Sequence, residues 1–186
     1  MTCTEPPQKL PRVAYSIQRA NLEHLSSIAE LIALCFYPPE HWLHWFRRLL
    51  QLGIYNDLCL RYHHSIEHSI YFMVLAPIQD RLKLLGSLEV SQRLLPGRGK
   101  SHPYLSNLAV HPDYRRQGIG RALLLAAEDW LKEQRCDRVY LHVLAMNHPA
   151  RFLYHQLGYS QESTIPAWFF PDKLLLSKFL RSSPRS

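Results

Sequence analysis

The sequence predicts an α/β protein, built as a mixed β-sheet that is covered by helices on both faces. Apolar residues alternate over several short runs, as in strands, and recur at helical spacing over others. Strands and helices alternate in the second half of the chain, which favours parallel pairing, whereas polar turns between strands favour antiparallel pairing elsewhere. At 186 residues, the chain has the length of one domain with a well-developed core.

The N-terminal part is predicted to contain one strand followed by two helices. The strand covers 15–19, and the first helix starts at Asn21 or Ser26 and is stopped by two consecutive prolines. The second helix covers about 40–52 and ends at Gly53. Its apolar stripe consists of Trp42, Trp45, Phe46, Leu49 and Leu50.

Six further strands and two further helices are expected after these. Strands at 71–76 and 82–90 are joined by a polar turn, and the basic, glycine-bearing segment 94–102 is a loop before the next strand. The remaining elements are a strand at 104–110, a helix ending near Gln134, a strand at 139–144, a helix at 147–157 closed by Gly158, and strands at 160–165 and 174–180. We expect one domain over 13–181, with mobile tails at 1–12 and 182–186.

Composition limits the class of function. The net charge is +7, from 22 Lys and Arg against 15 Asp and Glu, and the charges are scattered, so we expect an anionic ligand or acidic partner and no nucleic acid. No apolar run approaches the roughly 20 residues of a membrane helix. The four cysteines lie far apart without CxxC spacing. We therefore expect a soluble, cytoplasmic protein that does not bind a membrane.

The segment 115–121 has the most informative pattern in the chain. It reads Arg115-Arg116-Gln117-Gly118-Ile119-Gly120-Arg121, between the strand at 104–110 and the next helix. Backbone N–H groups at a helix N-terminus converge on an anion, and the peptide dipoles favour negative charge there. A side chain at Gly118 or Gly120 would hold a phosphate away from these amides. We interpret the loop as a pyrophosphate cradle, with a simple strand-to-helix turn as the alternative.

With the residues that follow it, this loop closely resembles the GNAT superfamily of acyl-CoA-dependent N-acetyltransferases. The matching order is a strand, Arg115-x-x-Gly118-x-Gly120, a helix, a strand, Asn147, a helix with Tyr154, and Gly158-Tyr159. The resemblance implies a GNAT-like fold, a mostly antiparallel sheet of six to seven strands between two helical layers. It also implies acetyl-CoA as cosubstrate and no metal. Arg135-Cys136-Asp137 stands where many relatives have a glycine.

The resemblance also assigns residues to the cosubstrate. The cradle would hold the pyrophosphate, and the backbone amides of Leu108 and Val110 would pair with the pantetheine arm and polarise the thioester carbonyl. Asn147 would bond to that arm or only cap its helix. The expected cofactor-binding residues are Leu108, Ala109, Val110, Arg115, Arg116, Gln117, Gly118, Ile119, Gly120, Arg121, Asn147 and Tyr154.

Acetyl transfer to an amine needs a base for the amine and a proton for the departing thiolate. An imidazole with an ordinary pKa near ~6.5 suits the first task, which favours His142, paired through the resemblance with Tyr104. Tyr154 matches the family tyrosine that protonates the thiolate. Glu89 is the second candidate base. For each of these residues the alternative is a purely structural side chain.

The acceptor is expected to be a protein N-terminus, with lysine as a second substrate. The runs 104–110 and 140–143 resemble protein N-terminal acetyltransferases and plastid and cyanobacterial enzymes that acetylate N-termini and lysines. An α-amine of pKa about 8 is neutral far more often at pH 7 than a lysine of about 10.4. The open alternatives are a small amine, such as a polyamine, amino sugar or antibiotic, and a non-catalytic acyl-CoA-binding protein.

The sequence contains two further groups of aromatic and histidine side chains, and we expect the chain to act as a monomer or homodimer. Aromatic side chains could wall the acceptor groove, namely Tyr37, Trp42, Trp45, Trp168, Phe169 and Phe170. His63, His64 and His68 lack the spacing of a metal site and are expected in a solvated loop.

Overall fold

The fold is a seven-stranded mixed sheet between two pairs of helices. The computed structural model describes residues 13–37, 44–64, 69–166 and 171–180. The strands are β1 (Ser16–Arg19), β2 (Ile70–Ile78), β3 (Arg81–Leu94), β4 (Ser101–Val110), β5 (Arg138–Leu144), β6 (Ser160–Ile165) and β7 (Lys173–Phe179). The helices are α1 (Leu25–Phe36), α2 (His44–His64), α3 (Ile119–Glu133) and α4 (His148–Gln156), with short 3₁₀ turns at Leu22–His24 and Pro112–Tyr114.

The strand order is β1-β2-β3-β4-β5-β7-β6, so β7 lies between β5 and β6. Only β4 and β5 pair in parallel, and every other neighbouring pair is antiparallel. The predicted α/β class, the mixed sheet and the strand number are therefore confirmed. The single parallel pair is joined through α3, as a crossover connection requires.

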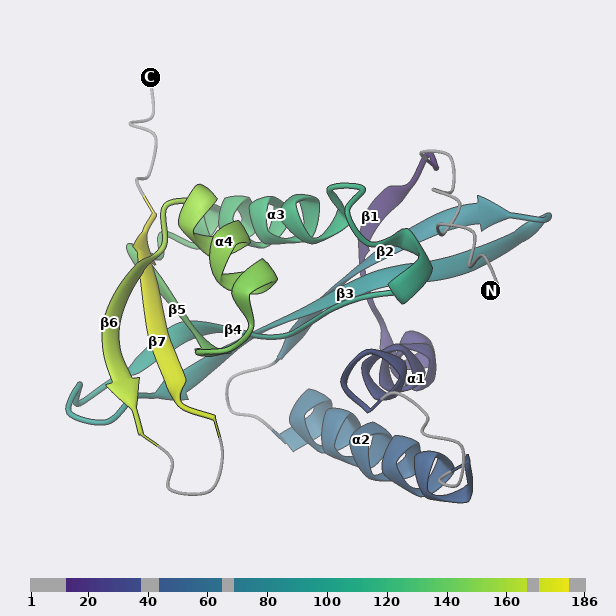
Figure 1. Ribbon diagram of the computed structural model, residues 1–186, viewed down its shortest axis with the longest axis horizontal. Coiled ribbons are helices and arrows are strands. Elements are labelled where there is room, and N and C mark those ends of the chain that lie inside the picture. Colours follow the sequence, from purple (N-terminus) through teal and green to yellow (C-terminus); the bar gives the residue numbers. More distant parts are fainter. Residues whose placement is uncertain (1–12, 38–43, 65–68, 167–170, 181–186) are drawn as a thin grey trace, which may run out of the picture.

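The helices divide between the two faces of the sheet, with α3 and α4 on one face and α1 and α2 on the other (Figure 1). The larger core lies under α3 and α4 and includes Leu85, Leu123 and Leu141, all essentially without solvent contact. The core under α1 and α2 is smaller, and Tyr71 of β2 and Ala109 of β4 reach it from the sheet. Alternate residues of one strand thus pack against the helices on opposite faces of the sheet.

Helix α2 is much longer than the sequence pattern indicates. We expected it to end at Gly53, but it continues to His64. A glycine inside a helix costs about 1 kcal/mol, which the burial of later apolar residues such as the fully buried Leu58 outweighs. Leu49 of the predicted stripe is exposed. The side chains of Trp42, Trp45 and Phe46 lie outside the described residues.

The segments around β3 and β4 also differ from expectation. The predicted loop at 94–102 shrinks to 95–100, because β3 continues to Leu94 and β4 begins at Ser101. Pro103 is tolerated inside β4, where it lies opposite Gln92 of β3.

Helices α3 and α4 end in the same hydrogen-bond motif with different residues. At the end of α3, Cys136 N–H donates to Leu131 O and Arg135 N–H to Lys132 O. This is a Schellman motif, which needs a left-handed residue at the position of Arg135, and Arg135 has a φ of 58°. At the end of α4 that position is Gly158, with a φ of 88°. The missing glycine noted in the sequence therefore leaves the turn intact but strained.

Replacing this arginine should stabilise the protein. Arg135→Gly removes a left-handed non-glycine residue and should raise the free energy of unfolding by about 0.5–1 kcal/mol, measured by denaturant unfolding. Gly158→Arg makes the reverse change in the matching motif and should lower it by about 1 kcal/mol or more. Equal stability of wild type and Arg135→Gly would contradict the assignment of strain.

Candidate active site

The site lies where β4 and β5 separate. The two strands pair only at Tyr104 with Tyr140 and at Leu105 with Leu141. Both strands continue, β4 to Val110 and β5 to Leu144, without a further paired residue between them. The β4 backbone beyond the last pair therefore has an edge that β5 does not cover.

A β-bulge marks the same point of β4. Ser87 of β3 lies opposite Ala109, but Glu89 lies opposite Ser106, so β4 carries one extra residue there. The bulge includes Asn107, which has a left-handed φ of 53°. A bulge bends its strand and redirects the backbone groups next to it. The predicted pantetheine-binding residues Leu108, Ala109 and Val110 follow directly.

The loop after β4 has the geometry of an anion cradle. Gly118 is the N-cap of α3, with a φ of 85°, and Arg116 is left-handed as well, with a φ of 64°. The side chains of Arg115, Arg116 and Arg121 are exposed around the helix N-terminus, and Gln117 is half-buried. Backbone N–H groups and the positive end of the helix dipole thus lie on a loop with three exposed arginines, of which Arg115 donates from Nε to Val110 O at 3.2 Å.

The two glycines of the loop differ in why the chain needs them. A Cβ at Gly118 would meet no atom within 4 Å, so only its backbone conformation demands glycine. Gly120 has no positive φ, and its Cβ would lie 3.5 Å from Leu153 Cδ2, an ordinary contact. Packing of the chain therefore does not explain Gly120.

Gly86 and Ile119 position the loop, and the importance of Gly86 was missed in the sequence. A Cβ at Gly86 would lie 2.9 Å from Ile119 Cγ2 and 3.0 Å from Leu123 Cδ1. The glycine lets the first turn of α3 pack directly on β3. The Ile119 side chain is buried in the core, so only its backbone could reach a ligand. A glycine inside a strand pattern was the available signal.

Tyr104 and His142 are in direct contact on adjacent strands. The Tyr104 hydroxyl lies 2.6 Å from His142 Nδ1, and the backbone N–H of His142 donates to the same hydroxyl at 3.1 Å. With one lone pair occupied by the amide, the hydroxyl donates its proton to Nδ1 when the ring carries its own proton on Nε2. The opposite tautomer would make Nδ1 the donor. The sequence prediction that these two side chains form a pair is consistent with this geometry.

The surroundings keep both groups neutral. Burial, followed by the positive charges of Lys173 and Arg93, holds the pKa of His142 below its usual value of 6.5. Burial likewise raises the pKa of Tyr104. Arg93 lies over the Tyr104 ring, with Cζ 4.3 Å from the ring centroid. A neutral imidazole at pH 7 can accept a proton.

Tyr154 packs from α4 into the core on the other face of the sheet. Its side chain is buried, and burial, followed by the neighbouring Tyr104 phenol, raises its pKa. The two phenols are therefore within electrostatic range of each other. The Schellman motif at Gly158 brings Tyr159 back against Tyr154, with ring centroids 5.7 Å apart. This contact helps to fix the Tyr154 ring.

Glu89, the second candidate base, is fully buried and bonded on both oxygens. Its carboxylate accepts from Arg61 Nη1 at 2.9 Å to each oxygen, from Ser69 Oγ at 3.2 Å and from Asn107 Nδ2 at 2.7 Å. Arg61 was not predicted, because the sequence pattern ended α2 at Gly53. Four hydrogen bonds already occupy the lone pairs of this carboxylate, which favours His142 as the base.

Asn147 has the structural role that the sequence left as an alternative. It is the N-cap of α4, and its side-chain oxygen accepts from the Ala150 N–H at 3.2 Å. Of the predicted groove aromatics, Tyr37 is half exposed, at 50%. Trp168, Phe169 and Phe170 lie outside the described residues.

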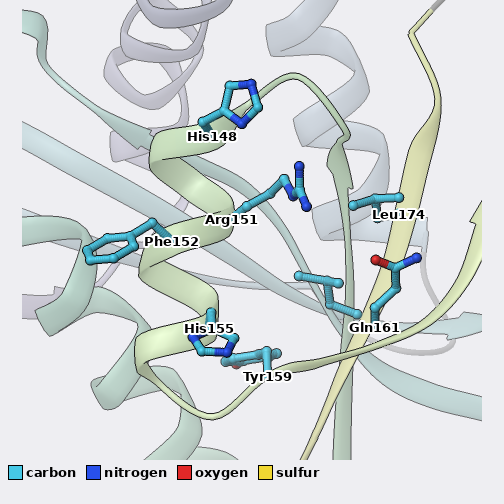
Figure 2. A pocket seen from close by; sticks show the side chains of 8 residues that line it. His148, Arg151, Phe152, His155, Tyr159, Gln161 and Leu174 are labelled. Carbon is cyan, nitrogen blue, oxygen red and sulfur yellow. The ribbon is translucent and has the colours of Figure 1, made fainter.

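A pocket of about 350 Å³ lies beside α4, away from this chemistry (Figure 2). His148, Arg151, Phe152 and His155 line it from one face of the helix, and Gln161 and Leu174 close it from β6 and β7. None of Tyr104, His142 and Tyr154 lines it. Arg151 donates to Ala145 O at 2.8 Å and is thereby bound to the protein itself. The pocket is separate from the strand gap.

Within the described ranges, no group of three His, Cys, Asp or Glu side chains is placed to hold a metal ion. We expected His63, His64 and His68 in a solvated loop. This prediction is wrong for His63 and His64, because both belong to α2. The His63 ring packs edge-on against Tyr62 at 5.6 Å between centroids, and His68 lies outside the described residues.

None of the described helices has the length and apolar character needed to span a bilayer.

Comparison with known proteins agrees with this architecture. Residues 26–159 match the Acetyltransferase (GNAT) family. The chain belongs to this family. The matched segment begins in α1 and ends just after α4, so it includes the bulge, the cradle and the three candidate catalytic residues of this GNAT protein.

Two curated relatives are similar over part of the sequence. GCN5-related N-acetyltransferase 7, chloroplastic, from Arabidopsis thaliana is 33% identical over 124 residues, 58% of this chain and 45% of that protein. The ribosomal protein bS18-alanine N-acetyltransferase of Escherichia coli is 45% identical over 67 residues, 36% of this chain and 45% of that protein. The matched stretch thus spans about half the length of each relative.

Solved structures extend the similarity in fold. The structure of the Escherichia coli ribosomal-protein alanine N-acetyltransferase has a TM-score of 0.66 at 19% identity, over 92% of this chain and 97% of that one. A PaiA N-acetyltransferase from Thermoplasma acidophilum, in complex with coenzyme A, has a TM-score of 0.65 at 18% identity, over 89% and 99%. These matches confirm the predicted GNAT-like fold.

The cradle can be tested at Gly118. Gly118→Val should raise the KM for acetyl-CoA by about tenfold, because a β-branched residue is strained at a left-handed φ and would turn the loop amides away. The measurement is steady-state kinetics or calorimetry with coenzyme A. Gly97→Val is the matched control, since Gly97 also has a left-handed φ of 75° and open space around it but lies in the β3–β4 loop. An equal change of KM in both variants would show that general strain, and not the cradle, is responsible.

Proposed function

We propose that this GNAT protein is an acetyl-CoA-dependent N-acetyltransferase whose main acceptor is the α-amine of a protein N-terminus, with lysine as a secondary acceptor. The observation that carries the proposal is the contact between Tyr104 and a neutral His142, beside the uncovered edge of β4. The gap between the strands supplies a place for the thioester arm, and the cradle at Gly118 a place for its pyrophosphate.

The described side chains provide each proton transfer that the reaction needs. The amine nitrogen attacks the thioester carbonyl carbon, the new C–N bond forms, and the C–S bond breaks. The amine proton passes to the Tyr104 hydroxyl, directly or through water, while the hydroxyl proton passes to His142 Nδ1 at 2.6 Å. Tyr154 then protonates the thiolate, and the proton held by His142 returns to the Tyr154 phenolate through water. Tyr104 stays neutral throughout, as its raised pKa favours.

The carbonyl itself needs donors for its developing negative charge. The backbone amides next to the bulge, at Leu108 and Val110, are our candidates, because the bulge redirects β4 beside its uncovered edge. Asn147 and the loop 115–121 would complete the binding of the cosubstrate, with Ala109 contributing its backbone alone, since its side chain is buried under α1.

Charge near the base supports a monoamine acceptor. Lys173 and Arg93 act on His142 as positive charges. They would repel a polyamine, which carries several charges of the same sign, more than a single N-terminal amine. The relatives that share the sequence include an enzyme named for transfer to an alanine of a ribosomal protein. An α-amine also loses its proton more readily than a lysine.

The acceptor can be identified by turnover against a panel of amines. The panel contains peptides with free or blocked N-termini, each with and without internal lysines, together with spermidine and an amino sugar. We expect the fastest acetylation of free N-termini and slower acetylation of lysines, measured by mass spectrometry. Tyr154→Phe is the control and should lower kcat by about 100-fold or more. Reaction of the small amines alone would contradict the N-terminal acceptor, and coenzyme A binding without any turnover would indicate a non-catalytic binding protein.

The protonation of His142 can be tested directly. Lys173→Gln removes a positive charge near the imidazole, so the protonated ring becomes easier to form and its pKa should rise toward 6.5. The measurement is an NMR titration of the imidazole protons in the free protein, with His142→Ala used to assign the signal. Lys132→Gln, on α3 and paired with Asp129, is the control and should leave the titration unchanged. An unchanged His142 titration in Lys173→Gln would remove Lys173 from the electrostatics of the site.

A further inference from the structure

The bulge in β4 is held by a single buried carboxylate. Asn107, the left-handed residue of the bulge, donates from Nδ2 to Glu89 Oε2 at 2.7 Å. Glu89 lies on β3, across from the bulge, and is fully buried. A left-handed conformation is unfavourable for a residue other than glycine, and asparagine tolerates it best when its side chain is bonded locally. The bond to Glu89 therefore selects the bulged form of β4.

The same carboxylate is tied to two other segments. Arg61 of α2 donates to both of its oxygens at 2.9 Å, and Ser69, just before β2, donates to Oε1 at 3.2 Å. Arg61 also pairs with the exposed Asp57 one turn earlier on α2. A buried charge is tolerated only when it is paired and hydrogen-bonded, and Glu89 has four such bonds. The carboxylate thus joins α2, the start of β2 and the bulge.

We propose that Glu89 is a positioning residue for acetyl transfer: through Asn107 it fixes the backbone amides that polarise the thioester carbonyl, and through Arg61 it links that geometry to α2. The inference rests on the proposed function, and it assigns to Glu89 a role different from that of a base. Helix α2 packs with α1 against Tyr71 and Ala109, whereas Tyr104 belongs to a separate cluster with Tyr140 and Leu175. Movement of α2 on acceptor binding would reach the bulge through one ion pair.

The mechanism of this positioning is geometric. Polarisation of a carbonyl requires donors at hydrogen-bonding distance from the developing oxyanion, and an error of about 1 Å can cost about 100-fold in rate. Pyrophosphate binding uses a different segment, the loop 115–121. Loss of the bond between Glu89 and Asn107 should therefore lower kcat strongly while changing the KM for acetyl-CoA little. If Glu89 were instead the base, removal of its carboxylate would lower kcat, but a change of residue 107 would not.

The test compares variants of the full chain in steady-state kinetics with the best peptide acceptor. Asn107→Gly removes the bond to Glu89 but keeps a residue for which a φ of 53° is allowed, so the backbone can still form the bulge. We expect its kcat to fall by about 10- to 100-fold, with a change in the KM for acetyl-CoA below about threefold. Asp57→Asn is the matched control, because Asp57 pairs with the same arginine but does not touch Glu89, and it should keep the wild-type kcat.

A double-mutant cycle shows whether Glu89 acts through Asn107. We expect Glu89→Gln and Asn107→Gly each to lower kcat when introduced singly. The double variant should have a kcat no lower than that of Glu89→Gln. If Asn107→Gly reacts at the wild-type rate, or if the two losses multiply, the inference is wrong. If circular dichroism shows that Glu89→Gln does not fold, Asn107→Gly alone tests the inference, through a lowered kcat with an almost unchanged KM for acetyl-CoA. A wild-type protein that turns over no amine would refute the proposed function and this inference together, whereas an active wild type with an unaffected Asn107→Gly refutes the inference alone.

Discussion

The early end of the β4–β5 ladder is the constraint on which the rest of the site depends. After two paired residues the strands separate, and β5 no longer covers that edge of β4, where Val110 O accepts from Cys35 Sγ and Arg115 Nε. Unpaired backbone groups beside a sheet are costly unless water or a ligand satisfies them. The bulge at Asn107 lies at the same level of the sheet. A thioester arm that adds to β4 as a strand would satisfy these groups and meet the proton-transfer residues in one place.

The three residues that we propose for proton transfer lie on both faces of the sheet. Tyr104 and His142 belong to the strands and lie on the face of α1 and α2, whereas Tyr154 comes from α4 on the other face. Their separation allows one side to receive the amine proton and the other to supply a proton to sulfur. Burial keeps the phenols protonated and the imidazole neutral, so the resting site carries little charge of its own.

Among the described residues, the buried charged side chains are Glu89 and Glu128. Glu89 is paired with Arg61 on one face, and Glu128 with Lys178 at 2.5 Å near the end of α3. Each ion pair joins a helix to the sheet. A buried pair contributes little net stability compared with apolar packing, but loss of one partner is costly, so such pairs favour one arrangement of the elements. In this protein they fix where α2 lies against the bulge and where α3 lies against β7.

The local pattern of the chain was sufficient for most of the fold and part of the site. Period-two and helical spacing predicted the strands and α-helices of the described residues, and the pattern of 115–121 predicted a glycine-bearing turn into α3, because strand, turn and capping preferences act over a few neighbouring residues. The pair of Tyr104 and His142 was expected through family resemblance. The end of α2 was not predictable, since Gly53 is an unfavourable helix residue that only burial against α1 and β2 compensates.

Only the tertiary structure decided the contacts between residues far apart in the sequence. The bulge at Asn107 depends on the register of β3 against β4, and the environment of Glu89 depends on Arg61, 28 residues away along the chain. No local signal reveals whether a strand carboxylate will be a solvated charge, a base or a structural anchor, because its pKa and its bonds come from whichever elements pack against it. By itself the sequence determined which elements form and where the glycine-bearing loop lies, because these follow from local preferences, whereas long-range packing determined which side chains meet beside that loop.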